Sequence, residues 1–553
     1  MDDLFQAHAA LLDAAVAASR RREFWSAFPE HPKAYPGSAP AEGQAAFEAL
    51  KNRPFELARD EQDELRGCWV GEEVSPFGMR LGITYRSQAA DDLVAAAQRA
   101  HAAWSEASVE QRVGVTLEIL VRLNAASFLI AQAVEHTTGQ ASAMAFQAGG
   151  PHAQDRGLEA VAYAYAEMTR VPEAVRWEKP IGRSFIRLDK NFFVVPRGIG
   201  LIIGCATFPT WNSYPALFAN LATGNAVIVK PHPAAILPLA LTVKIGREVL
   251  AGQGFDPDVL QLAPDTTEAP LAKILATHAA IDIVDFTGSS AFGSWLRTNV
   301  TDKLLFTEEA GVNTIVIAST NAFSAMCQNI AFSLSLYSGQ MCTAPQTIFV
   351  PASGISTDEG HKSFEAVAAS IAGAIDALLS DPVRAGAVLG AIQSPETLTR
   401  IEAARTLGRV VRDSSALPLE RARTATPLLI SLDASEATPA LEEWFGPIAF
   451  IVAVHDAEEG IARASAAART KGAITAALYS TDEAQIARAI PSYARAGVAL
   501  SVNLTGGIYV NQSAAFSDYH VTGANPAGNA CLTDTAFVAG RFRVVCVRRP
   551  AAA

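Results

Sequence analysis

Two side chains in this sequence have the chemistry of a nucleophile and of the base that serves it. Cys342 ends the segment 338–342 (Ser-Gly-Gln-Met-Cys), and Glu308 lies 34 residues earlier in the segment 306–313 (Phe-Thr-Glu-Glu-Ala-Gly-Val-Asn). A thiolate adds readily to a carbonyl carbon, and a carboxylate can take a proton from water. A lone cysteine is more often an inert buried residue, and paired glutamates more often lie on a solvated face. Here a small-residue turn and an apolar run follow Glu308, which favours a carboxylate that points into a cleft.

A second group of residues has the form of an anion site. In the segment 286–293 (Phe-Thr-Gly-Ser-Ser-Ala-Phe-Gly), Gly288 and Ser289 fall between an apolar run and a predicted helix. Glycine lets the backbone approach a ligand closely, and the first turn of a helix offers N–H groups to an anion. Taken alone, such a run is most often only a tight turn, so the prediction depends on the surrounding fold.

The predicted elements that would position these groups alternate between helices and strands. A helical pattern runs from about residue 89 to 168, where apolar residues recur at three- and four-residue steps. Short β-branched runs then alternate with helices, which predicts parallel strands covered on both faces. The expected strands are 200–204, 226–230, 260–262, 281–284 and 314–317 and, after a further helix, 347–350, 450–454, 474–479 and 498–502.

Three segments do not belong to this alternation of helices and strands. Residues 177–195 are predicted to form a hairpin, with strands 185–188 and 192–195 on either side of Asp189-Lys190-Asn191. Residues 541–547 are predicted to form a final strand. Residues 1–66 form an N-terminal extension, an alanine-rich helix followed by a loop with four prolines between positions 29 and 40. We expect the hairpin and the final strand to pair apart from the two main sheets.

Composition and charge narrow the class of protein. A chain of 553 residues exceeds what one hydrophobic core accommodates, which predicts two or three domains. The net charge of -12 argues against a nucleic-acid binder, whose surface would be basic. No apolar run predicts a membrane span, and the first residues lack a signal-peptide pattern. The six cysteines show no metal-ligand spacing, so we expect a reduced, cytoplasmic protein without a metal.

The spacing of Glu308 and Cys342 resembles that of the aldehyde dehydrogenase superfamily. This family carries a Glu-x-Gly-Gly or Glu-x-Ser-Gly segment and, at the same interval, a Gly-Gln-x-Cys segment. The resemblance implies that Cys342 is the thiolate nucleophile and Glu308 the general base. In this chemistry the thiolate adds to an aldehyde, hydride leaves to a nicotinamide dinucleotide, and the base activates the water that hydrolyses the thioester.

Other family segments match along most of the chain and imply the cofactor contacts. The lysine at the end of strand 226–230 matches the one that faces the adenosine ribose, and residues 286–293 match the turn beneath the pyrophosphate. Residues 443–447 (Glu-Trp-Phe-Gly-Pro) match the segment that holds the nicotinamide ribose and packs near the ring. The implied cofactor-binding residues are Lys230, Phe286, Gly288, Ser289, Gly293, Glu443 and Phe445.

The resemblance also implies the fold and the assembly. We expect an aldehyde dehydrogenase-like α/β fold with two doubly wound Rossmann-like domains and a small β oligomerisation element. Residues 67–307 would bind the dinucleotide, with the hairpin 177–195 inserted, and residues 308–504 would form the catalytic domain. Residues 505–553 would bridge subunits, because in the family such a hairpin joins the terminal strand and pairs with a neighbour. We therefore expect the protein to form a homodimer or a homotetramer.

One departure from the family concerns the oxyanion. The family usually has Asn-Phe-Pro, whose asparagine amide stabilises the alkoxide, where this chain has Thr207-Phe208-Pro209. Thr207 offers a hydroxyl with a shorter reach, and losing one such donor can lower turnover by about 10²–10³-fold. Asn212 lies five residues later, about 140° around a helix axis, so we expect it not to substitute.

A second departure concerns the cofactor. NAD-preferring members often carry a glutamate three residues after the lysine, where this chain has Pro233. Without that carboxylate a 2′-phosphate is not repelled. We therefore expect NADP to serve at least as well as NAD.

These departures, together with segments 207–212, 230–233 and 516–523, resemble the PaaN-type proteins of phenylacetate degradation. That resemblance implies a semialdehyde made by ring opening of an aromatic-derived coenzyme A thioester. Two alternatives stay open: a coenzyme A-acylating aldehyde dehydrogenase, and a degenerate scaffold that binds a ligand without turnover. The retained Glu308 argues against the first, and the joint presence of the site residues argues against the second.

Overall fold

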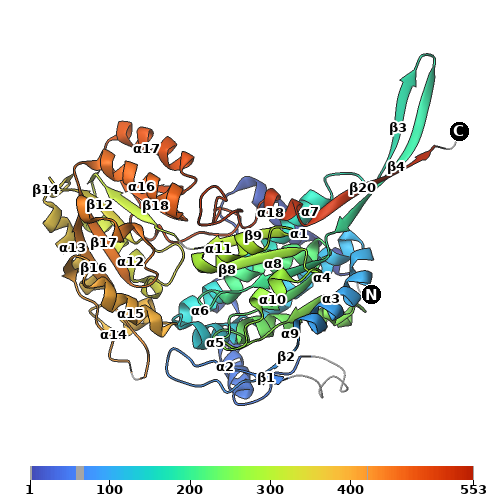
Figure 1. Cartoon of the computed structure of the whole chain (residues 1–553), viewed down its shortest axis with the longest axis horizontal. Helices are drawn as coiled ribbons and strands as arrows, with labels where there is room; N and C mark the ends of the chain where they lie inside the picture. Colours follow the sequence, from blue (N-terminus) through green and yellow to red (C-terminus); the bar gives the residue numbers. More distant parts are fainter. Residues whose placement is uncertain (1–2, 58–67, 310, 420, 552–553) are drawn as a thin grey trace.

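The computed structural model describes residues 3–57, 68–309, 311–419 and 421–551. The expected start of the first domain at residue 67, and Ala310 in the Glu308 segment, lie outside the described residues. Two lobes, each built on a largely parallel sheet, lie side by side, and an antiparallel ribbon extends from the first of them (Figure 1). The predicted architecture of two doubly wound sheets with a separate small β element is confirmed.

The sheet of the first lobe has five parallel strands in the order β7-β6-β5-β8-β9. The strands are β5 (Ile199–Ile203), β6 (Ala226–Lys230), β7 (Leu260–Leu262), β8 (Ile283–Gly288) and β9 (Leu304–Glu309). The strand order reverses between β5 and β8, and ligands of open α/β sheets bind beyond the carboxyl ends at such a point. Glu308 belongs to the edge strand β9, so the predicted domain division at residue 308 falls inside this strand.

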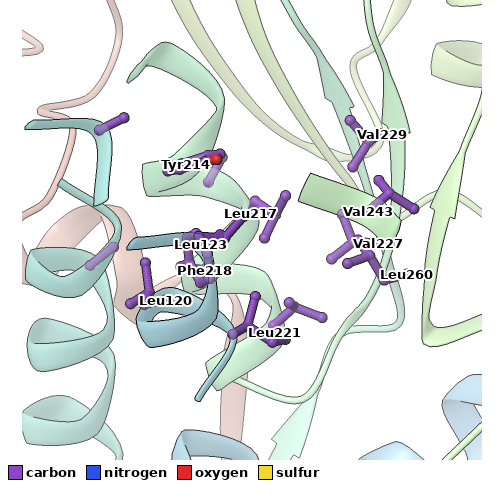
Figure 2. Close-up of a cluster of buried hydrophobic side chains, with 14 of the residues drawn as sticks. Leu120, Leu123, Tyr214, Leu217, Phe218, Leu221, Val227, Val229, Val243 and Leu260 are labelled. Carbon is purple, nitrogen blue, oxygen red and sulfur yellow. The ribbon is translucent and has the colours of Figure 1, made fainter. Parts of the chain in front are cut away.

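Helices cover both faces of this sheet. They are α3 (Ala90–Glu106), α4 (Val109–Ala125), α5 (Ser127–Thr138), α6 (Ser142–Gly149), α7 (Pro151–Met168), α8 (Pro209–Ala222), α9 (Leu237–Gly252), α10 (Ala272–Thr277) and α11 (Ser290–Asn299). Val227 and Val229 of β6 face one buried cluster, with Phe218 of α8, whereas Ala226 and Ile228 face another. This alternation follows from the two-residue period of a strand. Figure 2 shows the first cluster, in which α8 packs against α4.

The N-terminal extension packs into the first lobe. It contains α1 (Leu4–Arg21), η1 (Pro32–Ala34) and α2 (Ala39–Leu50), and the short pair β1 (Cys68–Val70) and β2 (Tyr85–Ser87) follows. Leu12 and Phe47 belong to the same buried cluster as the side chains of α4 and α8. Gly114 of α4 allows α1 to come close, because a Cβ there would lie 2.6 Å from the backbone nitrogen of Phe5. The extension is thus part of the core of this lobe.

The sheet of the second lobe has seven strands in the order β15-β16-β17-β12-β10-β18-β19, parallel except for the edge strand β15. The strands are β10 (Thr314–Ile317), β12 (Thr347–Pro351), β15 (Arg409–Arg412), β16 (Leu428–Asp433), β17 (Ile448–Val454), β18 (Thr475–Tyr479) and β19 (Ala499–Val502). Around it lie α12 (Phe323–Ser335), α13 (Phe364–Leu378), α14 (Pro382–Leu389), α15 (Pro395–Ala404), α16 (Ala457–Lys471) and α17 (Glu483–Arg495), with a small sheet of β11 (Ser319–Thr320), β13 (Ile355–Thr357) and β14 (Gly360–Lys362). Strands β15 and β16 were not predicted.

The ribbon consists of β3 (Ala174–Ile181), β4 (Ser184–Pro196) and β20 (Phe542–Pro550), with β4 in the middle. The predicted pairing of the hairpin with the terminal strand is confirmed. The predicted turn at Asp189-Lys190-Asn191 is wrong, because these residues lie within β4 and the turn is at Gly182, whose φ is +59°. Polar residues fit this strand because much of the ribbon is exposed to solvent.

No single helix in the described part of the chain is long and apolar enough to cross a membrane, although two sharply bent helix pairs reach that length and apolarity together.

Candidate active site

A tight turn presents Cys342 to the first lobe. Helix α12 is followed by η4 (Leu336–Gly339), in which Tyr337, Ser338 and Gly339 have φ values of +50°, +51° and +63°. Left-handed conformations of non-glycine residues cost about 1–3 kcal/mol each and persist where packing enforces them. A Cβ at Gly339 would overlap the carbonyl oxygen of Gly446, so this position requires glycine. The turn ends the helical segment and leads into the loop that carries Cys342.

Four polar side chains from distant segments meet at this point. Cys342 Sγ lies 3.6 Å from Glu308 Oε1. His520, in the segment that follows β19, places Nε2 2.8 Å from the same oxygen and 3.5 Å from the sulfur. Asn212 of α8 donates its Nδ2–H to Glu308 Oε2 at 2.9 Å. The structure therefore brings Cys342 and Glu308 together, and both oxygens of the carboxylate have a partner.

The surroundings of Cys342 and Glu308 set their charges. Burial alone would raise the pKa of Glu308, but attraction to the His520 imidazole and the hydrogen bonds from His520 and Asn212 outweigh it, so the pKa lies below its ordinary value of 4.5. Burial, reinforced by the negative charge of Glu308, raises the pKa of the Cys342 thiol well above its ordinary value. The pair therefore consists of a thiol and a carboxylate, with a short path for a proton between them.

Cys342, Glu308 and Asn212 line a cavity of about 320 Å³ between the two lobes. The first lobe contributes residues at the carboxyl ends of β5, β8 and β9, and the second lobe contributes the loops around Cys342 and residues 443–445. Small-molecule sites commonly measure about 300–1,000 Å³, so the cavity is large enough for a ligand. The predicted residues that line it are Thr207, Gly288, Ser289, Glu308, Cys342, Glu443 and Phe445.

The angle of about 140° between Thr207 and Asn212 was wrong, and Asn212 lies at the site, whereas the expectation that it does not replace the oxyanion donor stays a prediction. Helix α8 begins at Pro209, so Thr207 precedes the helix, and the angle between helical positions does not relate it to Asn212. Asn212 lines the cavity and also accepts a hydrogen bond from the thiol of Cys205 at 3.7 Å. The carbonyl oxygen of Thr207 accepts a hydrogen bond from Gln140 at 2.8 Å, which fixes its backbone at the cavity wall.

The segment 286–293 forms the expected strand, turn and helix. Strand β8 ends at Gly288, and Ser289 caps α11 by accepting the backbone N–H of Phe292 at 3.4 Å. Gly293 faces Glu309, and a Cβ at this position would overlap the Glu309 carboxylate. Gly293 therefore makes room for a neighbouring acid, whereas Gly288 and Ser289 lie on the cavity wall.

Lys230 and Phe286 are buried near the carboxyl ends of β6 and β8 and are not part of the cavity lining. Nζ of Lys230, at the end of β6, lies 2.7 Å from Oδ1 of Asp265, which follows β7. Phe286, near the end of β8, packs against Phe292 with ring centroids 5.2 Å apart. The acid partner of Lys230 was not predicted, although an aspartate directly beyond a strand of the same sheet is a signal that could have found it.

Glu443 brings a second carboxyl group to the cavity wall. Removal from water raises the pKa of Glu443 to about 7, with Arg400 opposing the shift and Glu309 adding to it. Arg400 donates a hydrogen bond to the carbonyl oxygen of Phe445, which ties the segment 443–447 to α15. The wall opposite the first lobe therefore combines a carboxyl group, a guanidinium cation and an aromatic ring.

The position of His520 beside Cys342 and Glu308 was not predicted from the sequence. The segment 516–523 was singled out for its resemblance as a unit, without a role for its histidine. His520 lies 178 residues from Cys342, and no local pattern connects them. A histidine in a segment that otherwise has a family match was the available signal.

A thiol and a carboxylate meet at the junction of two α/β lobes, and comparison with known proteins specifies the family. The profile of the aldehyde dehydrogenase family matches residues 83–526, and the chain belongs to this family of oxidoreductases. The crystal structure of an NAD-dependent aldehyde dehydrogenase from Burkholderia multivorans superposes with a TM-score of 0.97 at 51% identity, covering 100% of this chain and 99% of that chain.

More distant relatives agree with this assignment. Aldehyde dehydrogenase LUC3 from Fusarium sp is 26% identical over 406 residues, which are 72% of this chain and 79% of that protein. The N-succinylglutamate 5-semialdehyde dehydrogenase of Paraburkholderia xenovorans (strain LB400) is 28% identical over 410 residues, or 72% of this chain and 78% of that protein. The predicted superfamily is thus confirmed, whereas the PaaN-type resemblance stays a prediction.

Proposed function

We propose that this protein oxidises an aldehyde to the carboxylate, with NAD or NADP as hydride acceptor, Cys342 as nucleophile and Glu308 as general base. The observation that carries the proposal is the 3.6 Å contact between Cys342 Sγ and Glu308 Oε1, in a cavity that Gly288 and Ser289 also line. The family membership and the NAD-dependent relative from Burkholderia multivorans support the same activity.

The residues around the cavity suit a dinucleotide. Helix α11 begins beside Gly288 and Ser289, and the N–H groups of a first helical turn favour a phosphate. Lys230, which contacts Asp265 in this structure, would donate a hydrogen bond to the adenosine ribose when the cofactor binds. Glu443 would hold the nicotinamide ribose. When bound, the nicotinamide supplies the acceptor for the hydride of the aldehyde carbon.

The side chains of this protein perform the remaining steps. The Cys342 thiol gives its proton to Glu308, and the thiolate adds to the aldehyde carbon. Thr207 lines the cavity, and we assign its hydroxyl to the alkoxide, because the amide of Asn212 is held by Glu308. After oxidation of the adduct to a thioester and release of the proton from Glu308, the carboxylate deprotonates a water molecule, which attacks the acyl carbon and frees the thiolate.

For the substrate we propose a semialdehyde from aromatic-acid or phenylacetate breakdown, free or as a coenzyme A thioester. The resemblance of segments 207–212 and 516–523 to PaaN-type proteins supports this choice. A relative from Paraburkholderia xenovorans is named for a different semialdehyde, N-succinylglutamate 5-semialdehyde. The comparison therefore supports a semialdehyde as the substrate class more strongly than it supports one compound.

We also propose a homodimer or homotetramer assembled through the ribbon. Its strands expose large apolar side chains on both faces, which a neighbouring subunit would cover. The exposed residues are Val175, Ile181, Phe185, Ile186, Phe193, Val195, Val544, Val545 and Val547.

A turnover assay tests the function. The purified protein is given a panel of free and coenzyme A-linked semialdehydes with NAD or NADP, and formation of the reduced cofactor is followed by absorbance. Cys342→Ala should abolish the signal, whereas Cys546→Ala, which alters an exposed thiol on β20, should leave it unchanged. Undiminished activity of Cys342→Ala would refute the proposal. A coenzyme A thioester product that appears only with added coenzyme A would favour the acylating alternative.

A further inference from the structure

His520 lies between the two reacting groups of the site, yet the steps above do not use it. Its buried Nε2 is 2.8 Å from Glu308 Oε1 and 3.5 Å from Cys342 Sγ. The edge of the Trp211 ring packs against the imidazole, with centroids 4.5 Å apart and planes at 73°. The ring is therefore held in a fixed position from which a single nitrogen reaches both the nucleophile and the base.

The two nitrogens of the imidazole have different partners. Nδ1 lies 3.4 Å from Ser513 Oγ, and this oxygen accepts a hydrogen bond from Nη2 of the buried Arg156 at 3.2 Å. Nε2 lies within hydrogen-bond distance of an oxygen of the ionised Glu308 carboxylate, which only accepts, so Nε2 carries a proton and donates toward the carboxylate and the sulfur. The contact of Ser513 with Nδ1 holds the ring from its far side.

We propose that His520 is a further catalytic residue, whose Nε2–H bridges the Glu308 carboxylate and the Cys342 sulfur. The inference rests on the proposed function. When the nucleophile forms, the S–H bond of Cys342 breaks and an O–H bond forms on Glu308 Oε1. His520 keeps its proton and donates it in a hydrogen bond to the new sulfur anion. Hydrogen bonds to charged groups are the stronger ones, so this donor favours a thiolate in a place where burial opposes it.

The N-terminal extension holds the segment that carries His520. Trp25 packs edge-on against Phe516, with centroids 4.7 Å apart, and the Arg22 guanidinium lies 4.0 Å from the centre of the Tyr519 ring. Phe516 has a φ of +64°, a conformation that a phenylalanine keeps only where its surroundings enforce it. The extension thus acts on the active site by fixing the backbone next to His520.

Alkylation of Cys342 tests the role of His520 without substrate or cofactor. The rate of modification by iodoacetamide is measured across a pH series, with the Cys342 peptide identified by mass spectrometry. His520→Phe keeps an aromatic ring against Trp211 but has no N–H, and should slow the reaction at neutral pH by about 10- to 100-fold and move its midpoint to higher pH. His520→Gln, whose amide can donate, should recover part of the rate.

The matched control is His455→Phe, which changes an exposed histidine far from the cavity and should behave as the unmodified protein does. An unchanged alkylation midpoint in a folded His520→Phe would overturn the proposal. If that variant does not fold, Ser513→Ala serves instead, because it removes the contact that holds Nδ1 on the far side of the ring. A several-fold slower alkylation would then support the role, and an unchanged rate would overturn it.

Failure of this inference can be told apart from failure of the proposed function. Loss of turnover in Cys342→Ala, combined with normal alkylation in His520→Phe, would remove only the role of His520. Turnover that survives in Cys342→Ala would instead remove the proposed function itself.

Discussion

Asn212→Ala removes the shorter of two hydrogen bonds that Glu308 Oε2 accepts, the other coming from the Thr287 hydroxyl at 3.4 Å. The bond from Nδ2 to Oε2 is 2.9 Å long and buried, while His520 serves the other oxygen. A hydrogen bond to a charged group contributes about 1.5–3 kcal/mol. Since one pKa unit corresponds to about 1.4 kcal/mol, the pKa of Glu308 should rise by about one to two units in the variant.

The sign of the pH effect follows from the role of the carboxylate. The pKa of Glu308 lies below 4.5, so the carboxylate is ionised throughout the neutral range. It becomes protonated only as the pH falls through that low pKa. A general base must be ionised, so kcat has an acid limb at the pKa of this group. In Asn212→Ala this limb should move up by about one to two pH units, with little change of kcat in mildly alkaline buffer.

The assay is the pH dependence of kcat at saturating aldehyde and cofactor. Ser213→Ala is the control, because Ser213 is the next residue of α8 and its hydroxyl has no hydrogen-bond partner among the described residues. An acid limb at the same pH as in the unmodified protein would refute the reasoning. So would an equal loss of kcat at every pH, which would mean that Asn212 acts on the oxyanion rather than through Glu308.

Three further predictions concern the cofactor, the fold and the assembly. Asp265→Asn leaves Lys230 without its acid partner and should raise kcat/KM for NADP relative to NAD by about tenfold, since one charge no longer repels a 2′-phosphate; an unchanged ratio in steady-state kinetics would contradict this. Arg541→Met leaves the buried Asp285 carboxylate without its ionic partner, although Asn220 still donates to it, and should lower the free energy of unfolding by about 3–5 kcal/mol in urea titrations, whereas a loss below 1 kcal/mol would count against it. Phe193→Asp places a charge on the exposed apolar face of the ribbon and should shift the mass in light scattering to that of a smaller species; an unaltered mass would exclude this face as the interface.

The elements of the fold differed in how well local sequence predicted them. Buried parallel strands such as β6 are continuous β-branched runs bounded by turn residues, so sequence alone located them. The turn of the ribbon was misplaced, because polar residues at 189–191 look like a turn but lie in a strand that is largely exposed to solvent. Only the pairing of β4 with both β3 and β20 shows that the strand continues through them.

The active site divides in the same way. The sequence pointed to Cys342 and Glu308 through its resemblance to the aldehyde dehydrogenase family, whose segments at this spacing can be read along the chain. Tertiary structure alone decided that His520 and Asn212 share the Glu308 carboxylate, and that Asp265 is the partner of Lys230. Such contacts depend on how whole helices and strands pack and on where each one begins. Residues that meet across a folded core are far apart in the chain, so no local sequence pattern connects them.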